Sequence, residues 1–269
     1  MDYSKKFRVK PGSKVNLHKV DPAETPGFNS KEDAGDMAAQ NVAKLAELQQ
    51  LFYADNRFGL LIVLQAMDGG GKDGTIRHVM SGLNPQGVEV TSFKVPSAEE
   101  MDHDFLWRIH HAVPARGDIG IFNRSHYEDV LITRVHKLIP KDVWQERYEQ
   151  INAFEQYLAD NNIITLKFFL HISNEEQKRR FQQRIDDPKR NWKISSADFT
   201  ERKLWDDYQE AYGAAIEKCS TTTAPWYIIP ANNKWFRNVA ISQIILDKME
   251  SLDLHYPKPL VDLSNIVLV

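Results

Sequence analysis

The sequence predicts an α/β protein whose mostly parallel sheet is covered by helices on both faces. Short apolar runs alternate along the chain with helical stretches, and this alternation is typical of parallel sheets. The first run, GLLIVLQAMD, ends at Asp68 and is followed at once by glycines, as expected of a strand buried on both faces. With 42% hydrophobic and 26% charged residues, the 269-residue chain has a globular composition, which excludes a collagen-like or wholly disordered protein.

Residues 1–30 are rich in Lys, Pro, Gly and Asp, and their apolar residues show no sustained helical or strand period. They predict an irregular arm on the surface. A helical extension is predicted in residues 31–55, where apolar side chains recur on one helical face at Val42, Leu45, Leu48 and Phe52. Because no repeat or long linker interrupts the rest, we expect residues 31–269 to form a single domain.

Four more strands and two more helices are expected downstream. The further strand candidates are the runs Val88–Val95, Asp118–Phe122, Ile163–Ile172 and Trp226–Ile229. One amphipathic helix is indicated by residues spaced by 4, 3, 3 and 4 positions, namely Trp144, Tyr148, Ile151, Phe154 and Leu158. Another is indicated by the apolar residues Phe236, Val239, Ile244, Ile245 and Met249.

Charge and cysteine content limit the class of protein. Lys and Arg number 34 against 37 Asp and Glu, so the formal net charge is -3 and no basic field attracts nucleic acid or a membrane surface. The one cysteine, Cys219, cannot form an intrachain disulfide, which fits a reducing compartment, and we interpret it as structural. Residues 1–10 lack an apolar h-region, and Leu60–Leu64 is too short to span a bilayer. We therefore expect a cytoplasmic protein that binds neither nucleic acid nor membranes.

The segment from Gln65 to Thr75, QAMDGGGKDGT, predicts a phosphate-binding loop. It has the required order of strand, glycine-rich loop, lysine and helix. Glycines let backbone N–H groups converge on phosphate oxygens, the helix N-terminus adds partial positive charge, and Lys72 supplies a full charge. Two residues depart from a strict Walker A motif: Ala66 replaces the first glycine, and Asp73 replaces the Ser/Thr that normally meets Mg²⁺. A glycine-rich turn without a ligand is the alternative.

The second cluster, Asp118 to Asp129 (DIGIFNRSHYED), is an apolar strand that ends in polar and charged residues. Ligands of open α/β sheets bind beyond the carboxyl ends of the strands, so this cluster should face the glycine-rich loop. It is similar to a Walker B strand, with Asn123 in place of the usual acidic metal ligand. Alternatively, Asn123 or Ser125 caps the following helix.

The third feature, Glu175 to Lys193, holds seven basic and four acidic residues. Arg180 and Arg184 share a helix face there. Either this is a solvated charged helix, or it is a basic lid, at about residues 175–200, that closes over phosphates and excludes water.

Taken together, ordered blocks along nearly the whole chain resemble the family-2 polyphosphate kinases. The blocks are Phe7–Pro11, QAMDGGGKDGT, GLNPQGV, SFKVPS, DFLWRIH, FNRSHYEDVL, LKFFLHIS, Asn191–Lys193 and APWYIIPANNKW. The resemblance implies a three-layer P-loop kinase fold of the thymidylate-kinase type with a basic helical lid, and a cytoplasmic homo-oligomer, either a dimer or a tetramer. It also implies dependence on Mg²⁺, with Mn²⁺ as an alternative.

The implied reaction is reversible transfer of the terminal phosphoryl group between inorganic polyphosphate and nucleotides, from AMP to ADP and from ADP to ATP. Other purine nucleotides are further candidate substrates. Two alternatives stay open: an ATP-dependent nucleotide kinase of the same fold, and a non-catalytic nucleotide-binding protein, the latter motivated by Asn123 and the imperfect Walker A motif.

The resemblance also implies roles for individual residues. The catalytic residues are Asp68, Lys72, Arg124 and Glu128, and Asp68 and Glu128 also hold the metal. The residues implied to bind phosphate, nucleotide or polyphosphate are Gly69, Gly70, Gly71, Lys72, Asp73, Gly74, Thr75, Arg77, Lys94, Arg108, Asn123, Arg134, Arg180 and Arg184. Some branches carry Asn at the position of Glu128, and the branch with Glu is associated with accepting nucleoside monophosphates as well as diphosphates.

Overall fold

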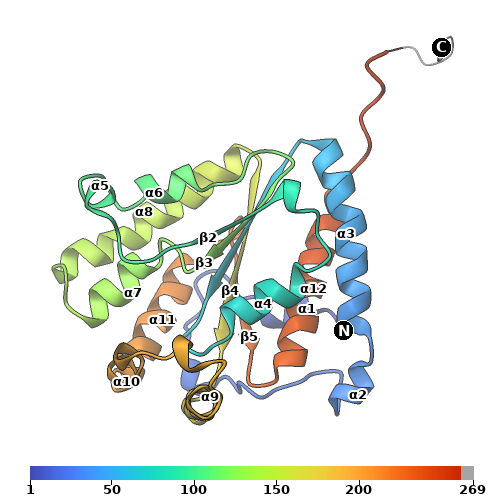
Figure 1. Cartoon of the computed structure of the whole chain (residues 1–269). Coiled ribbons are helices and arrows are strands. Elements are labelled where there is room, and N and C mark those ends of the chain that lie inside the picture. The colour runs from blue at the N-terminus through green and yellow to red at the C-terminus, as the bar shows by residue number, and fades with distance from the viewer. Residues whose placement is uncertain (262–269) are drawn as a thin grey trace.

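The computed structural model describes residues 1–261, and its centre is a five-stranded sheet (Figure 1). The strand order is β2-β3-β1-β4-β5, and every neighbouring pair is parallel. The strands are β1 (Gly59–Gln65), β2 (Val88–Ser92), β3 (Ile119–Asn123), β4 (Ile163–His171) and β5 (Trp226–Pro230). The predicted α/β class is thus confirmed, and each of the five predicted strands is present.

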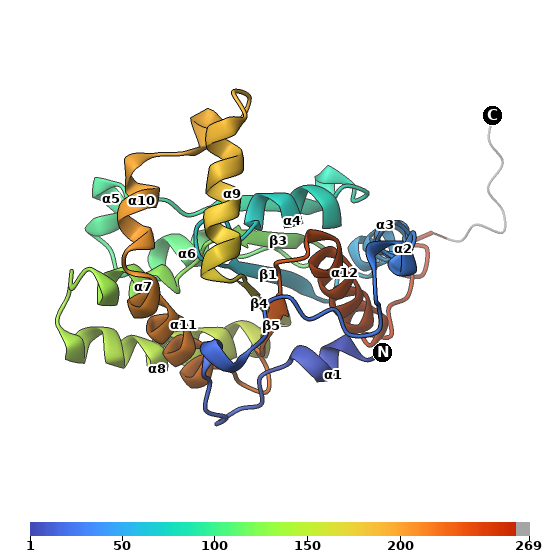
Figure 2. The ribbon, with the colours of Figure 1, turned by 90° about the horizontal axis from the view of Figure 1, so that it is seen from below.

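Helices cover both faces of the sheet and make three layers (Figures 1 and 2). On one face lie α1 (Tyr3–Phe7), α3 (Met37–Asp55), α4 (Lys72–Val79) and α12 (Lys234–Glu250). On the other lie α6 (Trp107–His111), α7 (Glu128–Val135), α8 (Lys141–Asp160) and α11 (Trp205–Cys219). The remaining helices are α2 (Lys31–Ala34), α5 (Ala98–Met101), α9 (Asn174–Asp186) and α10 (Ser196–Arg202), with 3-10 turns at Leu17–Lys19, Pro85–Gly87 and Asn191–Lys193. No helix within residues 1–261 is long and apolar enough to cross a membrane.

The helix predicted in residues 31–55 is divided in two. Helix α2 ends at Ala34, its C-cap Gly35 has a φ of 48°, a positive value that glycine adopts easily, and α3 begins at Met37. The two helices predicted downstream are α8 and α12, and both present their apolar residues to the sheet.

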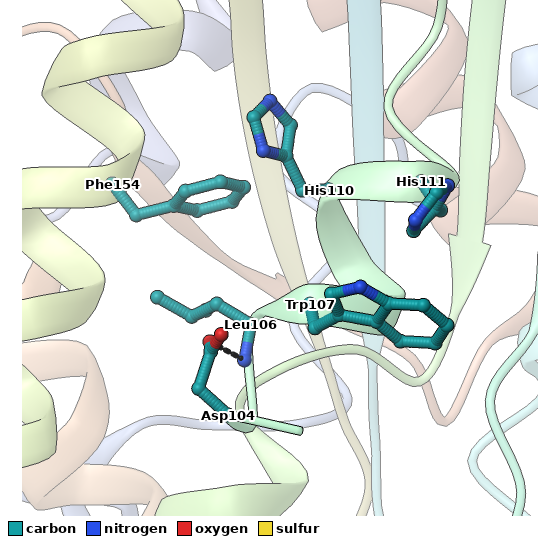
Figure 3. A pocket seen from close by; sticks show the side chains of 6 residues that line it. All are labelled: Asp104, Leu106, Trp107, His110, His111 and Phe154. Carbon is teal, nitrogen blue, oxygen red and sulfur yellow. Dashed lines mark hydrogen bonds between the residues drawn. The ribbon is translucent and has the colours of Figure 1, made fainter. Parts of the chain in front are cut away.

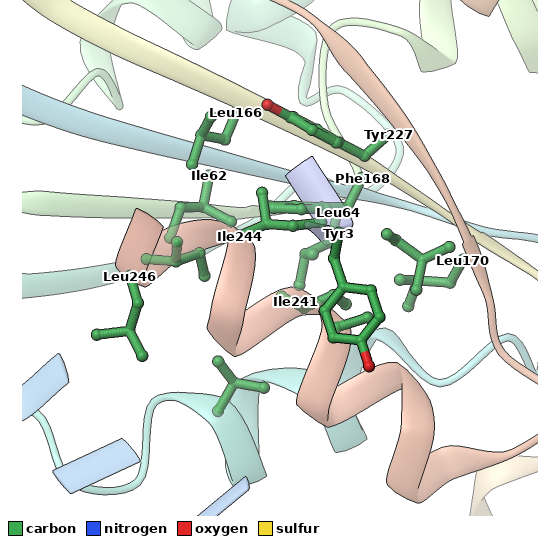
Figure 4. Close-up of a cluster of buried hydrophobic side chains, with 14 of the residues drawn as sticks. Tyr3, Ile62, Leu64, Leu166, Phe168, Leu170, Tyr227, Ile241, Ile244 and Leu246 are labelled. Carbon is green, nitrogen blue, oxygen red and sulfur yellow. The ribbon is translucent and has the colours of Figure 1, made fainter. Parts of the chain in front are cut away.

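The larger of the two cores lies between the sheet and α12 (Figure 4). Ile62 and Leu64 of β1 and Phe168 of β4 point toward Ile241 and Ile244 of α12, and all five side chains are buried. Alternate residues of the central strands therefore fill the two cores on opposite faces, which explains the continuous apolar runs of β1 and β4.

The N-terminal arm is mostly exposed or half-buried, but three of its side chains are anchored in the cores, which the expected surface arm does not include. Tyr3, Phe7 and Leu17 are buried, at 2%, 7% and 2% exposure. The two aromatic rings pack on Phe236 of α12, with centroids 5.7 and 6.0 Å away. A helix as short as α1 offers too few residues to display an apolar period, so its burial has no sequence signal. The division into an arm and one domain stays a prediction.

A buried ion pair joins the sheet to α8 beneath the polar end of β3. The ammonium of Lys167 in β4 contacts the carboxylate of Glu155 in α8, and both side chains are at most 1% exposed. The ammonium also donates to the hydroxyl of Tyr127 at 2.8 Å and to the carbonyl of Cys219 at 2.7 Å. Cys219 is itself fully buried, as its interpretation as a structural residue requires. Because Tyr127 directly precedes α7, this cluster fixes where α7 begins.

We expect Glu155→Met to lower the free energy of unfolding by about 3–5 kcal/mol, because it leaves the buried Lys167 ammonium without its charged partner. Adding Lys167→Met should restore most of the loss. Urea denaturation measures both, with Glu149→Met, at an exposed position on the same helix, as the control. A loss below about 1 kcal/mol in the single variant would contradict the assignment.

Candidate active site

The glycine-rich loop after β1 curls back on itself and opens onto α4. The Gly70 N–H donates to the carbonyl of Met67 at 2.9 Å, and Gly69 and Gly71 have φ values of 78° and 104°. Helix α4 begins at Lys72 without a side-chain cap, so its first-turn N–H groups have no partner within the helix. The loop therefore has the backbone form that an anion site needs.

Steric contacts explain why this loop consists of glycines. A Cβ on Gly70 would lie 2.4 Å from the Cβ of Ala66, and one on Gly71 would lie 2.2 Å from Nη1 of Arg237. Both positions therefore exclude a side chain. Ala66, one of the departures from the Walker A motif, is packed directly against the turn.

Lys72 reaches back over this loop. Its Nζ donates to the carbonyl of Ala66 at 3.0 Å, and the side chain is buried. Burial lowers the pKa of its ammonium, while the nearby carboxylate of Asp68 opposes that shift. An ammonium has three donors, so two stay available to a ligand.

Arg180, predicted as a lid cation, lies behind the loop instead of over it. Nη1 donates to the carbonyls of Gly69 and Gly70 at 2.8 and 2.9 Å, and Nη2 donates to Ala231 at 2.5 Å. Nε donates to Glu176 at 2.6 Å, and the side chain is only 5% exposed. Arg180 therefore holds the loop backbone with its donors already used.

Arg124 and Asp68 connect the ends of β3 and β1. Nη2 of Arg124 donates to Oδ1 of Asp68 at 2.8 Å, and both side chains stay partly exposed, at 42% and 32%. Arg124 has a φ of 63°, an uncommon value for a non-glycine residue, and its N–H donates to the carbonyl of Leu64 at 3.1 Å. This strained position turns the guanidinium toward Asp68 at the carboxyl edge of the sheet.

Glu128 is the first residue of α7 and belongs to the same group of charges. Burial raises the pKa of its carboxyl, while Arg124, Lys72 and a hydrogen bond from Gln65 oppose that rise. The predicted catalytic residues Asp68, Lys72, Arg124 and Glu128 thus lie within one electrostatic cluster.

The carboxylates here fit a divalent cation only together with other ligands. No group of three or more His, Cys, Asp or Glu side chains that could hold a metal occurs among residues 1–261. Asp68 and Glu128 supply two carboxylates, and Mg²⁺ commonly completes its octahedral shell with water and substrate phosphates. Asn123 donates to Asp73 at 2.9 Å, so these two departures from the Walker motifs contact each other.

Other predicted binding residues lie outside this cluster. Arg77 is exposed on the last turn of α4, Arg108 donates to the carbonyl of Lys94 at 2.9 Å, and Arg184 approaches the carbonyl of Lys193 only at 3.4 Å. Arg134 stacks on Trp144 at 4.9 Å and lines a separate cavity of about 900 Å³.

A smaller cavity of about 400 Å³ lies between α6 and α8 (Figure 3). Trp107, His110 and Phe154 line it with three neighbours, and none of the predicted site residues does. Neither of these two cavities includes the glycine-rich loop, so the candidate active site is defined by its charged side chains.

Three residues of the site were not among the predicted site residues, although two of them, Gln65 and Gln177, lie in segments that the sequence analysis singled out. Gln65 bonds Ser125 at 3.2 Å, Gln177 donates to the carbonyl of Asp68 at 2.8 Å, and the Tyr212 hydroxyl donates to the carbonyl of Ala66 at 3.1 Å. Gln65 alone has a signal, because it is the one polar residue of the buried strand β1.

We expect Arg180→Ala and Arg184→Ala to differ. Arg180→Ala removes the donor from the carbonyls of Gly69, Gly70 and Ala231 and removes one of the two arginine partners of Glu176, so it should lower the free energy of unfolding by at least about 2 kcal/mol. Arg184→Ala removes one long hydrogen bond and an exposed contact with the Phe181 ring, and it should change the free energy of unfolding by no more than about 0.5 kcal/mol. Chemical denaturation compares them, and equal losses would reject the distinction between a loop support and a lid residue.

Comparisons with known proteins agree with this arrangement. Residues 28–257 match the family model described as Polyphosphate kinase 2. The AMP/ADP-polyphosphate phosphotransferase of Meiothermus ruber is 50% identical over 98% of this chain and 99% of its own length. The ADP-polyphosphate phosphotransferase of Rhodopseudomonas palustris is 48% identical over 95% of this chain and 92% of its own.

A solved structure has the same fold. The crystal structure of polyphosphate kinase 2 from Arthrobacter aurescens TC1 superposes with a TM-score of 0.93 at 45% identity, covering 97% of this chain and 94% of the other. The family match spans most of the sequence, and the structural match extends to the N-terminal arm. The chain therefore belongs to the polyphosphate kinase 2 family.

Proposed function

We propose that this protein transfers the terminal phosphoryl group between inorganic polyphosphate and nucleoside mono- and diphosphates. The observation that carries the proposal is the cluster of Lys72, Arg124, Asp68 and Glu128 at the carboxyl ends of β1 and β3. Two cations there can neutralise phosphoryl charge, and two carboxylates can hold a metal. The names of the Meiothermus and Rhodopseudomonas relatives support polyphosphate, AMP and ADP as substrates.

Phosphoryl transfer requires a protein mainly to position groups and stabilise charge. A phosphate oxygen of AMP or ADP is already anionic at neutral pH, so its in-line attack on the terminal phosphorus of polyphosphate needs no strong general base. Lys72 and the loop amides hold the phosphates, and Arg124 stabilises the charge on the transferred group. In the reverse direction ATP donates to the polyphosphate chain.

A divalent cation, Mg²⁺ with Mn²⁺ as the alternative, fits the two carboxylates. When bound it neutralises charge on the phosphate oxygens, and Asp68 and Glu128 would hold it. Since Arg124 already bonds one oxygen of Asp68, the second oxygen of that carboxylate stays available. The cytoplasmic location and the homo-oligomeric state stay predictions of the sequence.

The test is an assay with polyphosphate and either AMP or ADP, without any other nucleotide, in which AMP, ADP and ATP are followed over time. We expect ADP and ATP to form, and Lys72→Ala to reduce the rate on the order of 10²–10³-fold, because it removes a positioned cation from the developing charge. Lys44→Ala, at an exposed position on α3, is the control. If polyphosphate transfers nothing, the assay is repeated with AMP and with ATP in place of polyphosphate. Transfer from ATP would then point to an ATP-dependent nucleotide kinase, and nucleotide binding without turnover to a non-catalytic protein.

A second prediction concerns Glu128 and the range of acceptors. With AMP bound, the transferred group must sit about one phosphate nearer the nucleoside, and a carboxylate at this position favours the cation there. Glu128→Asn should therefore reduce AMP phosphorylation much more than ADP phosphorylation. Asp129→Asn, on the neighbouring residue that pairs with Arg147 at 3.1 Å, should leave the ratio of the two rates unchanged.

The competing explanation is that Glu128 only stabilises the start of α7. In that case both activities fall together with the melting temperature. Measuring both rates and the melting temperature on one preparation separates the explanations, and a selective loss with ADP would exclude Glu128 as a determinant of acceptor range.

A further inference from the structure

Arg237 of α12 is a buried cation packed directly against the glycine-rich loop. Its side chain is 1% exposed, and Nη1 lies 2.2 Å from where a Cβ of Gly71 would be. Nε and Nη2 both donate to Oδ1 of the adjacent Asn238, at 3.1 and 2.8 Å. Nη1 has no hydrogen-bond acceptor among residues 1–261. One donor edge of a nearly inaccessible guanidinium is therefore unused, and it lies beside the loop.

The charged groups around Arg237 are mostly of its own sign. Arg180 acts directly on the Arg237 guanidinium. The nearby Lys234 interacts with Arg179, Arg180 and Arg237 and with one carboxylate, Glu176. That carboxylate already pairs with Arg179 and Arg180, at 2.7 and 2.6 Å. Burial, together with Arg180, lowers the pKa of Arg237 to about 9, so it is still charged at neutral pH. A buried charge without a counterion is costly, and the structure offers it no protein counterion.

A purely structural role does not account for Arg237. Arg180 has such a structural role, because it supports the loop by donating to the carbonyls of Gly69 and Gly70. Arg237 makes no hydrogen bond to the loop among the residues described. It approaches Gly71 closely but leaves its donor free.

The start of α12 adds a second source of positive potential. The 17-residue helix begins at Lys234, and its N-cap, Asn233, makes no side-chain cap hydrogen bond. First-turn N–H groups without a partner in the helix favour anions. The Lys234 side chain is exposed on this turn, and partial desolvation of its ammonium, together with the neighbouring arginines, lowers its pKa. An anion placed here would meet the full charge of Lys234, the partial positive charge at the start of α12 and the unused donor of Arg237.

We propose that Arg237, Lys234 and the first turn of α12 form an anion subsite that binds a phosphate group of the polyphosphate chain beside the glycine-rich loop. The chemistry it recognises is a phosphate oxyanion. The choice of polyphosphate over a nucleotide phosphate rests on the proposed function. Polyphosphate is a long row of charged phosphates, so it can contact basic groups beyond the glycine-rich loop as well as the loop itself. Arg237 is thus a binding residue for the donor.

The experiment measures binding of tripolyphosphate alone and of ADP alone by calorimetry, so that no turnover occurs, and the melting temperature without ligand. The variants are Arg237→Met, Arg237→Lys and the exposed Lys234→Gln, with Lys248→Met, a cation at the opposite end of α12, as the control. We expect Arg237→Met to weaken tripolyphosphate binding at least tenfold and ADP binding less than twofold. Arg237→Lys should recover part of the affinity, Lys234→Gln should weaken it about threefold, and the control should match the parent.

The unliganded melting temperature of Arg237→Met should equal or exceed that of the parent, because the variant removes an unpaired buried charge. A lower melting temperature with equal losses for both ligands would assign Arg237 a structural role and overturn the proposal. Unchanged tripolyphosphate affinity in Arg237→Met and Lys234→Gln would also overturn it, and so would a selective loss of ADP, which would assign the subsite to the nucleotide. If the parent binds tripolyphosphate but transfers nothing, the proposed function fails while the binding comparison still decides the subsite.

Discussion

The candidate active site depends on one interaction, the donation from Arg180 to the carbonyls of Gly69 and Gly70. Peptide groups are planar and trans, so a carbonyl that points toward Arg180 sends the N–H of the next residue the opposite way. The Gly71 N–H is thereby directed away from α9, toward the side on which a phosphate can bind. Glu176 neutralises the guanidinium at 2.6 Å, which lets this support exist inside the protein. The loop is thus held by a cation behind it and left free in front.

The buried cations of this protein fall into two kinds, distinguished by how many of their donors the protein uses. Lys167 contacts a carboxylate, a hydroxyl and a carbonyl. Arg180 donates hydrogen bonds to backbone carbonyls and to Glu176. Lys72 bonds only the carbonyl of Ala66, and Arg237 bonds only its neighbour Asn238. A buried cation whose donors all have acceptors in the protein has a structural role, since a buried donor without a partner costs free energy. Unused donors beside the glycine-rich loop indicate a place for a ligand.

Local patterns explain which parts could be predicted from the sequence. The apolar run of β1 and the glycines after it fix the strand, the loop and the start of α4, because adjacent residues determine all three. Helical spacing places Arg180 on a face of α9, but only the tertiary fold decides that this face meets the loop and not solvent. Arg237 is the one charged residue among the buried residues of α12, and a single charged residue on the apolar face of a helix has no distinctive period. Interactions between distant segments, such as Tyr3 with Phe236, are likewise invisible to periodicity.

The two departures from the Walker motifs are best understood as one arrangement. Asp73 stands where a hydroxyl is usual and Asn123 where a carboxylate is usual, and the Asn123 amide donates to Asp73 at 2.9 Å. An aspartate at position 123 would bring two carboxylates to this separation, where each would repel the other and raise its pKa. The amide instead donates a hydrogen bond to the carboxylate that the loop helix carries. An amide in place of the acid at the end of β3 therefore makes an acid at the start of α4 tolerable, and it leaves Asp68 and Glu128 as the carboxylates that we propose to hold a metal.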